Sequence, residues 1–413
     1  MAVSSLLVQL AMTMPSLTLK QGALYVILVV LIIGRFRREV IPTVQLCTSQ
    51  DTKAKDGQET ALSLSFLPYP NTSSIITPSD DYIGPETTYR AWASNSSFPC
   101  FEAEDNWRTI YTQRKPTRNG LLYTREMKTG SSTLAGVYLR LAHRKGKLLN
   151  PSGGLCKVRI DHSSAQDMEY GSRDKSRSFL ISMLREPTKR SISAYFHFKV
   201  SEQREAPIDV NFQSFFLANQ QFSNYYIKDL AMREINFTSS DNDPYLLVQE
   251  IIDSFDFIAI TERLDESLVV MKMLLGLEVA DILYMSAKQG GSFTTGPKST
   301  PCIYLIPSFL SNGMKAFFVS ESWKEYVKLD TLLYKAANKS LDNTIDALGR
   351  PEFENQLSHF REVLARAHIR CENETIYRCD PAGNYRGSEN ATCLLWDIGC
   401  GYECLNRFYP SAD

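Results

Sequence analysis

The sequence has no excess of charge of either sign, and this absence excludes one class of partner. Its 413 residues include 45 lysine and arginine side chains against 46 aspartate and glutamate side chains, a formal net charge of −1. A protein that coats nucleic acid needs a basic excess to neutralise phosphates, so we expect no nucleic-acid partner. A local basic pocket is compatible with this balance, because net charge averages over the whole surface.

Zinc-ligand spacing is also absent. The chain has nine cysteines but no Cys-x-x-Cys pair, so we expect no metal site and predict disulfides instead. Disulfides require an oxidising compartment, and the alternative is a cytosolic protein with free thiols. An odd cysteine count leaves one thiol either free or bonded to a second chain in a homo-oligomer, and we expect it to be Cys47. Six N-x-S/T sequons support the oxidising compartment: Asn71, Asn95, Asn236, Asn338, Asn373 and Asn390.

No hydrophobic run is long enough to span a bilayer without help from its flanks. The longest, residues 22–34, covers about 20 Å of helix against a hydrocarbon core of about 30 Å. Extension back to Leu17, with Lys20 reaching toward the interface, completes a span over residues 17–34. We predict a single-pass anchor there, because a cleaved signal peptide would need a small-x-small site that is missing.

The flanks of this anchor give conflicting orientations. Basic residues at 35–38 would face the cytosol under the positive-inside rule, whereas the sequons and cysteines place the same side in the lumen. We favour the lumenal orientation because more signals support it. Between residues 48 and 97, 16 of 50 residues are serine or threonine with no persistent periodicity. The chain thus divides into a tail (1–16), the anchor (17–34) and a Ser/Thr-rich stem (35–115), followed by a folded region.

Strand and helix patterns alternate from residue 121 onward. We predict strands at 121–127, 179–184 and 255–260, and helices at 132–144, after Pro187 and at 264–275. Residues 324–347 are predicted to be helical with interruptions. Gly276 is the expected cap of the 264–275 helix. A further helix should follow Pro351, and five of the nine cysteines come after it. Alternation of this kind predicts an α/β fold with a parallel sheet flanked by helices.

Two segments of this alternation have the composition of anion sites. The first, Lys-Thr-Gly-Ser-Ser-Thr at 128–133, is a turn of small hydroxyl residues that opens a helix. Helix amino termini attract anions, although an ordinary helix cap would have the same composition. The second is Arg185-Glu186-Pro187 at the end of a buried strand, with Ser193 on the following helix. An arginine paired with a nearby carboxylate is the alternative for this segment.

The ordered pair resembles the sulfotransferase superfamily. It is most similar to the Golgi membrane-bound carbohydrate sulfotransferases, such as the heparan sulfate 2-O- and galactose 3-O-sulfotransferase groups. The family pattern usually has Arg-Asp-Pro where this chain has Glu186. The likeness covers residues 121–349 and includes the segments 255–275 and 330–345. The resemblance implies a P-loop-like sulfotransferase domain at 116–350, which the Cys-rich extension 351–413 follows in the sequence.

The resemblance also implies the roles of individual residues. The first motif would bind the 5′-phosphosulfate of 3′-phosphoadenosine 5′-phosphosulfate (PAPS): Lys128, Thr129, Gly130, Ser131, Ser132 and Thr133. Arg185 and Ser193 would bind its 3′-phosphate, and Lys128 would stabilise charge on the leaving phosphate. The acceptor would be a glycan or glycoprotein hydroxyl, at the lumenal face of the Golgi membrane.

Sulfuryl transfer to a hydroxyl also needs a base. His162 lies where 2-O-sulfotransferase-like members carry a catalytic histidine, and a histidine suits proton transfer near neutral pH. Asp167 and Glu169 are the fallback, and His143 and His197 lie within reach in sequence. Two other functions stay open. One is a P-loop-type kinase or nucleotide hydrolase, against which the missing Gly-Lys-Ser/Thr counts; the other is a non-catalytic glycan-binding protein on the same scaffold.

Overall fold

The computed structural model describes residues 89–93, 98–101, 103–104, 117–149, 154–235, 243–288, 291–293 and 301–408. The predicted anchor at 17–34 and Cys47 lie outside these ranges, as does most of the predicted stem. Within the described ranges, no helix combines the length and apolar character that crossing a membrane requires.

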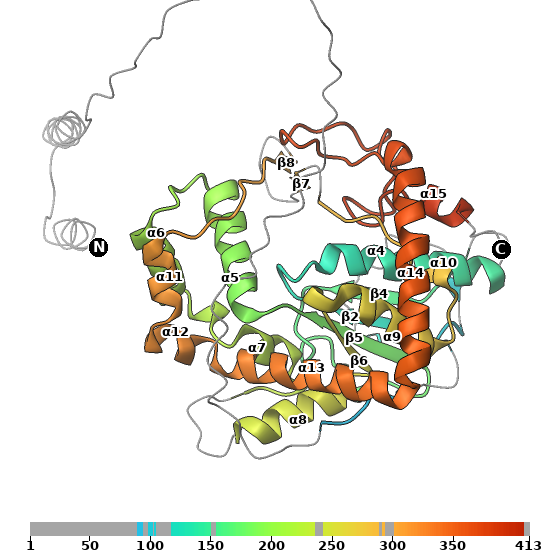
Figure 1. The fold of residues 1–413 in the computed structure, drawn as a ribbon, viewed down its shortest axis with the longest axis horizontal. Helices are drawn as coiled ribbons and strands as arrows, with labels where there is room; N and C mark the ends of the chain where they lie inside the picture. The colour runs from blue at the N-terminus through green and yellow to red at the C-terminus, as the bar shows by residue number, and fades with distance from the viewer. Residues whose placement is uncertain are drawn as a thin grey trace, which may run out of the picture. The chain divides into compact units, whose positions relative to one another are not determined.

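A four-stranded parallel sheet forms the centre of the fold (Figure 1). Its strands are β2 (Gly120–Thr124), β4 (Val158–Asp161), β5 (Ser178–Leu184) and β6 (Phe257–Ile260), in the order β4-β2-β5-β6. Their residues are almost all buried, as expected for a parallel sheet covered on both faces. The predicted α/β fold is therefore confirmed. The chain moves outward from β2 to β4 and then from β5 to β6, so the strand order reverses between β2 and β5. Such a switch point is where open α/β sheets bind ligands, outside the carboxyl ends of the strands.

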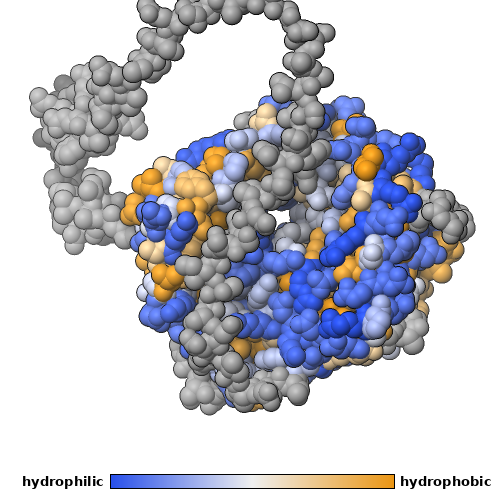
Figure 2. All heavy atoms as spheres, viewed as in Figure 1, coloured by the Kyte–Doolittle hydropathy of each residue, from blue (hydrophilic) through white to orange (hydrophobic). Residues whose placement is uncertain are grey.

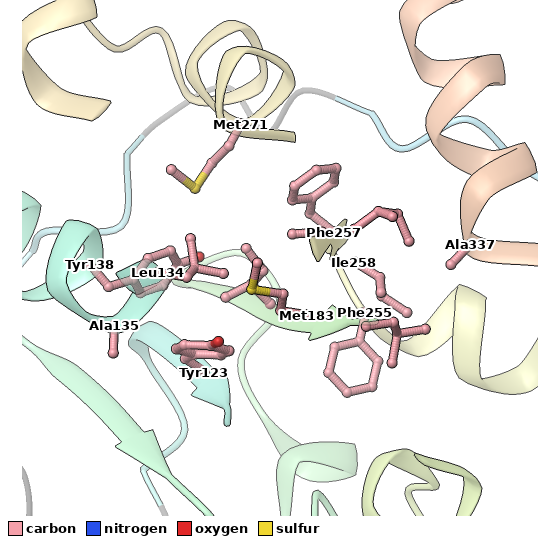
Figure 3. Close-up of a cluster of buried hydrophobic side chains, with 14 of the residues drawn as sticks. Tyr123, Leu134, Ala135, Tyr138, Met183, Phe255, Phe257, Ile258, Met271 and Ala337 are labelled. Atoms are coloured by element: carbon pink, nitrogen blue, oxygen red, sulfur yellow. The ribbon is translucent and has the colours of Figure 1, made fainter. Parts of the chain in front are cut away.

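Helices that follow the strands pack back onto the sheet. Helix α4 (Ser131–Leu149) lies against β2 and β4, whereas α9 (Leu264–Leu275) and α13 (Lys328–Leu348) lie against β6. Figure 3 shows the resulting core, in which Tyr138 of α4 and Met271 of α9 meet side chains from the strands. Tyr123 of β2 and Tyr138 pack with ring centroids 5.6 Å apart. This core fixes where β2 ends and α4 begins, and hence the position of the loop between them.

The remaining elements surround this centre. The short strands are β1 (Ala103–Glu104), β3 (Leu155–Cys156), β7 (Ser292–Phe293) and β8 (Cys302–Ile303). The other α-helices are α5 (Pro187–Tyr195), α6 (Asp209–Ala218), α7 (Tyr225–Leu230), α8 (Pro244–Ser254), α10 (Val279–Ile282), α11 (Asn312–Phe318), α12 (Glu321–Tyr326), α14 (Arg350–Cys371) and α15 (Tyr402–Arg407). Figure 2 shows a largely hydrophilic face, with apolar residues gathered over α6 and α11, where Ile208, Val210 and Leu217 are exposed.

Element boundaries differ from the predicted ones where the backbone turns. The strand predicted at 121–127 ends at Thr124, because Arg125 begins a turn in which Lys128 and Gly130 adopt φ of +66° and +76°. The interrupted helical region predicted within 324–347 is confirmed as two helices, α12 and α13, with Val327 between them. Strand β5, the start of α5 at Pro187 and the Gly276 cap of α9 all match the predictions.

Four disulfides confirm the cysteine prediction. They join Cys100 to Cys156, Cys302 to Cys379, Cys371 to Cys404, and Cys393 to Cys400. Three of them fix the C-terminal extension to itself or to β8.

The extension also packs directly on α4, as the red loops above α4 in Figure 1 indicate. The closest approach is between Gly136 of α4 and Gly399 of the extension. A Cβ added at Gly136 would lie 2.8 Å from the Gly399 nitrogen, so only glycine fits at this contact.

Candidate active site

The two predicted anion motifs lie side by side at the switch point of the sheet. The first follows β2 and the second follows β5, its immediate neighbour. The guanidinium Nη1 of Arg185 donates a hydrogen bond of 3.3 Å to the carbonyl of Lys128. The Thr261 hydroxyl lies 2.6 Å from the Thr129 carbonyl oxygen and 2.9 Å from that of Leu184. The carboxyl ends of three neighbouring strands are thereby tied together around one point.

The first motif is held as a tight loop that ends on a helix amino terminus. The Thr129 hydroxyl donates 3.0 Å to the Glu126 carbonyl, and the Thr133 amide donates 2.9 Å to the Gly130 carbonyl. Lys128 is in the left-handed region, which is uncommon for a residue with a side chain and is concentrated at functional sites. The 19-residue helix α4 begins at Ser131, so its free amides and dipole favour an anion here.

Side-chain hydroxyls of this motif already have partners inside the protein. Ser132 accepts a hydrogen bond of 2.7 Å from Arg125, and Thr133 accepts one of 3.1 Å from the Ala287 amide. The Thr129 hydroxyl donates within the loop. Only the Thr129 hydroxyl donates in these contacts, so the Ser132 and Thr133 hydroxyls, which accept, keep their hydrogens for a ligand.

Lysine and arginine side chains gather at this edge of the sheet. The pKa of Lys128 is lowered to about 7, first by burial and then by the charges of Lys288 and Arg185. No carboxylate of the described ranges lies within ion-pair distance of Lys128. Arg125 is buried, and its Nε has no hydrogen-bond partner among the described residues. An unpaired ammonium and an orphaned buried guanidinium nitrogen fit a ligand with several negative charges.

His162 comes directly after β4, at the same edge of the sheet. Its Nδ1 lies 2.6 Å from the carbonyl oxygen of Arg125. A carbonyl can only accept, so Nδ1 carries the hydrogen and Nε2 keeps its lone pair. Removal of water by the surrounding protein and the charge of Arg125 lower the pKa of His162 to about 3, although the residue is partly open to solvent. The ring is thus neutral at physiological pH, with the basic nitrogen fixed as Nε2.

The other predicted bases lie in different surroundings. Glu169 pairs with Arg118, which precedes β2 and so lies at the opposite end of the strands. His143 is twelve residues along α4 from Ser131, about 18 Å at 1.5 Å per residue. Ser193 lies half-buried near the end of α5, and no hydrogen bond within the described ranges joins its side chain to Arg185.

Glu186, the departure from the usual Arg-Asp-Pro pattern, has a structural role. Its carboxylate accepts hydrogen bonds from the amides of Thr188 and Lys189 at 3.0 and 2.8 Å, which caps α5. Either acidic residue can do this, so the change leaves the anion motif intact. Its amide in turn donates to Glu262, the residue after Thr261.

A cluster of buried polar side chains packs against the inner side of the 128–133 loop. Glu126 is fully buried, and burial raises the pKa of its carboxyl well above the ordinary value. The Tyr225 hydroxyl accepts from the Met127 amide at 3.3 Å, and the Arg190 guanidinium lies 4.4 Å from the Tyr225 ring centroid. Arg190 thus braces the loop from within the core. Sequence reasoning did not find this role, because only the folded chain brings α5, α7 and the loop together.

Comparison with known proteins identifies the family. A family model described as galactose-3-O-sulfotransferase matches residues 172–382, just over half of the chain. Galactose-3-O-sulfotransferase 3 of Bos taurus is 22% identical over 311 residues, which cover 66% of this chain and 68% of the relative. Galactosylceramide sulfotransferase is 21% identical over 288 residues in Bos taurus and over 291 in Homo sapiens, with 62% of this chain and 64% of each relative covered. The chain spans about two thirds of the length of these relatives.

The region matched by the family model contains Arg185, Ser193 and Lys288, and it begins after the 128–133 loop and His162. The predicted relationship to the carbohydrate sulfotransferases is confirmed. Together with a parallel sheet whose switch point carries the two predicted anion motifs, the match shows that this chain belongs to the galactose-3-O-sulfotransferase family.

Proposed function

We propose that the protein transfers a sulfuryl group from PAPS to a hydroxyl group of a glycan or glycoprotein acceptor. The observation that carries the proposal is the direct contact between the two anion motifs, through the hydrogen bond from Arg185 to the Lys128 carbonyl. Motifs in contact can hold the two charged ends of one small nucleotide, whereas motifs on different faces could not.

Each motif has a separate task in this proposal. The amides of 129–132, the Thr133 hydroxyl and the Lys128 ammonium would hold the 5′ end of the donor, while Arg185 would hold the 3′-phosphate with Ser193 on the following helix. When bound, PAPS supplies a sulfuryl group whose bond to a phosphate oxygen breaks as the acceptor oxygen bonds to sulfur. Lys128 would stabilise the negative charge left on that phosphate oxygen.

His162 takes the acceptor proton in this account. The hydrogen bond from Nδ1 to Arg125 leaves Nε2 as the basic atom, and the low pKa keeps the ring neutral before the reaction. The approach of an anionic donor would raise that pKa, because a nearby negative charge stabilises the imidazolium. His162 therefore becomes a stronger base as the site fills.

The cellular setting is part of the proposal. Four disulfides in the described residues favour an oxidising compartment, and the segment at 17–34 would anchor the chain to the Golgi membrane with residues 116–350 and the extension 351–413 in the lumen. Acceptors there are glycans on lipids or proteins. We infer the acceptor class from the family alone.

A labelled-sulfate transfer assay tests this function. The full-length chain is incubated with labelled PAPS and a mixture of galactose-terminated glycans, beside the variants Lys128→Ala and Arg185→Ala and the exposed control Lys315→Ala. We expect transfer by the wild type and the control, and a loss of about 100-fold or more in both site variants. Undiminished transfer by both site variants would refute the proposal, as would a wild type that binds the nucleotide but sulfates no acceptor.

A further inference from the structure

Residues 283–288, which follow α10, connect the 128–133 loop (the phosphate loop) to the C-terminal extension. The Ala287 amide donates to the Thr133 hydroxyl, 3.1 Å away, at the start of α4. On the other side, the Tyr377 hydroxyl donates 2.9 Å to the Ser286 carbonyl. The segment is thus held between the loop and the extension, and its last described residue is Lys288.

Lys288 directly follows Ala287, whose amide is bonded to Thr133, so its backbone lies beside the 128–133 loop. Its charge contributes to lowering the pKa values of both Lys128 and His162. Burial lowers the pKa of Lys288 itself; Asp397 and Glu202 oppose that effect, and Arg125 adds to it. Lys288 therefore belongs to the group of cations that surrounds the loop.

Asp397 is the carboxylate closest to Lys288, and it comes from the extension. Its Oδ2 lies 3.9 Å from the Lys288 nitrogen, and the residue is only 7% exposed. At that distance the two charges attract, but no direct hydrogen bond forms. The ammonium consequently keeps its hydrogens for another acceptor, and the Asp397 Oδ2 has no hydrogen-bond partner in the described part of the chain.

The position of Asp397 is fixed by the backbone around it. Leu395 and Ile398 exchange two backbone hydrogen bonds of 3.2 and 2.7 Å, so Asp397 sits in a tight turn. The disulfide between Cys393 and Cys400 closes a ring around this turn, and Gly399 packs on Gly136 of α4.

We propose that Lys288 is a second catalytic cation of the sulfuryl-transfer site and that Asp397 of the disulfide-closed turn is its positioning residue. This inference rests on the proposed function, and it assigns the C-terminal extension a part in the active site. A second cation has a clear use here. With a pKa of about 7, Lys128 alone is only half protonated at neutral pH in the free protein. Lys288 would add positive charge near the leaving phosphate oxygen, because negative charge develops on that oxygen when the donor is cleaved.

The test compares the pH dependence of kcat/KM for labelled-sulfate transfer in the full-length variants Lys288→Ala, Asp397→Asn and Asp397→Glu. Lys315→Ala and Glu389→Gln serve as exposed controls, the latter in the extension itself. We expect Lys288→Ala to lower kcat by about 100-fold and Asp397→Asn by about tenfold, with Asp397→Glu largely restored. Thermal melting checks that each variant is folded.

The fall of kcat/KM at high pH, the alkaline limb of the pH profile, distinguishes a positioning role of Asp397 from a purely structural one. Loss of Lys288 removes a repelling charge, raises the pKa of Lys128 and moves the limb to higher pH. Loss of the Asp397 charge lowers the pKa values of both lysines and moves the limb to lower pH, by ~1 pH unit. Folded variants with unchanged kcat and an unmoved limb would overturn the inference while wild-type transfer still supports the proposed function. A wild type without any transfer would refute both.

Discussion

Lys128 has a pKa of about 7 because it is buried beside Lys288 and Arg185. Ligand binding at this residue should therefore be coupled to a proton. A bound phosphate stabilises the ammonium and raises its pKa, so binding above pH 7 must take up a proton. We predict that 3′,5′-bisphosphoadenosine binds with uptake of close to one proton at pH 8, measured by calorimetry in buffers of different ionisation enthalpy.

The variant Lys128→Ala should bind the nucleotide more weakly and take up correspondingly fewer protons, whereas Lys315→Ala should behave as wild type. Binding heats that do not depend on the buffer would contradict the assignment of Lys128 to the donor site. Equal proton uptake by Lys128→Ala would do so as well.

His162 should act on turnover and not on donor affinity. Its basic Nε2 is fixed by the hydrogen bond from Nδ1 to Arg125, and it carries no charge with which to hold phosphate at neutral pH. We predict that His162→Ala lowers kcat by about 10²- to 10⁴-fold and changes the affinity for 3′,5′-bisphosphoadenosine by less than about threefold. His359→Ala, on the exposed side of α14, is the matched control. Full turnover by a folded His162→Ala would show that another group takes the proton.

The sequence predicts site residues that lie within a short motif. It does not predict site residues that come from distant segments and meet only in the folded chain. Lys128 and Arg185 stand next to strand and helix signals, so their placement at one sheet edge follows from the order of elements. Lys288 and Asp397 come from distant segments that only tertiary packing unites.

At the scale of elements, Thr261 joins three strands through one side chain. Its hydroxyl lies between the carbonyls of Thr129 and Leu184, so its loss leaves both with one partner fewer. We predict that Thr261→Val lowers the free energy of unfolding by about 1–2 kcal/mol and weakens nucleotide binding, whereas Thr261→Ser keeps both near wild type. Denaturant unfolding measures the first effect, and Thr331→Val on α13 is the control. A Thr261→Val protein with unchanged nucleotide affinity would show that the loop keeps its place without this tie.

The strands and helices themselves were largely predictable because burial and propensity agree in them. The run of buried apolar residues in β5 and the Pro187 start of α5 were placed correctly. The error at the end of β2 falls where the chain leaves the sheet after Thr124 and bends into the loop, although the strand was predicted to continue to residue 127. Such bends depend on residues with left-handed backbone conformation, such as Lys128. The amino-acid type of a lysine does not predict this conformation.

At the scale of the whole molecule, the C-terminal extension and α4 are packed through glycine. A methyl group at Gly136 would meet the backbone of Gly399, which disulfides hold in place. We predict that Gly136→Ala lowers the free energy of unfolding by about 1–3 kcal/mol and also lowers sulfate transfer, since α4 carries the phosphate loop. Gly276→Ala is the control, because its added Cβ meets no atom within 4 Å and only backbone strain is expected. Equal effects of the two substitutions on activity would contradict a coupling between extension and loop.

The extension illustrates what sequence could not supply at this scale. Five clustered cysteines predicted disulfides, but nine cysteines allow too many pairings to choose from. The pairings decide that the Cys393–Cys400 turn lies on α4, and thus that the extension reaches the site.

The most direct test of the central claim compares two nucleotides that differ by one phosphate. The affinities of 3′,5′-bisphosphoadenosine and adenosine 5′-phosphate are measured by calorimetry on the wild type, Lys128→Ala and Arg185→Ala. If the two motifs hold opposite ends of one donor, the wild type prefers the bisphosphate, Lys128→Ala weakens both ligands by a similar factor, and Arg185→Ala abolishes the preference. An Arg185→Ala protein that still prefers the bisphosphate to the wild-type extent would contradict the account.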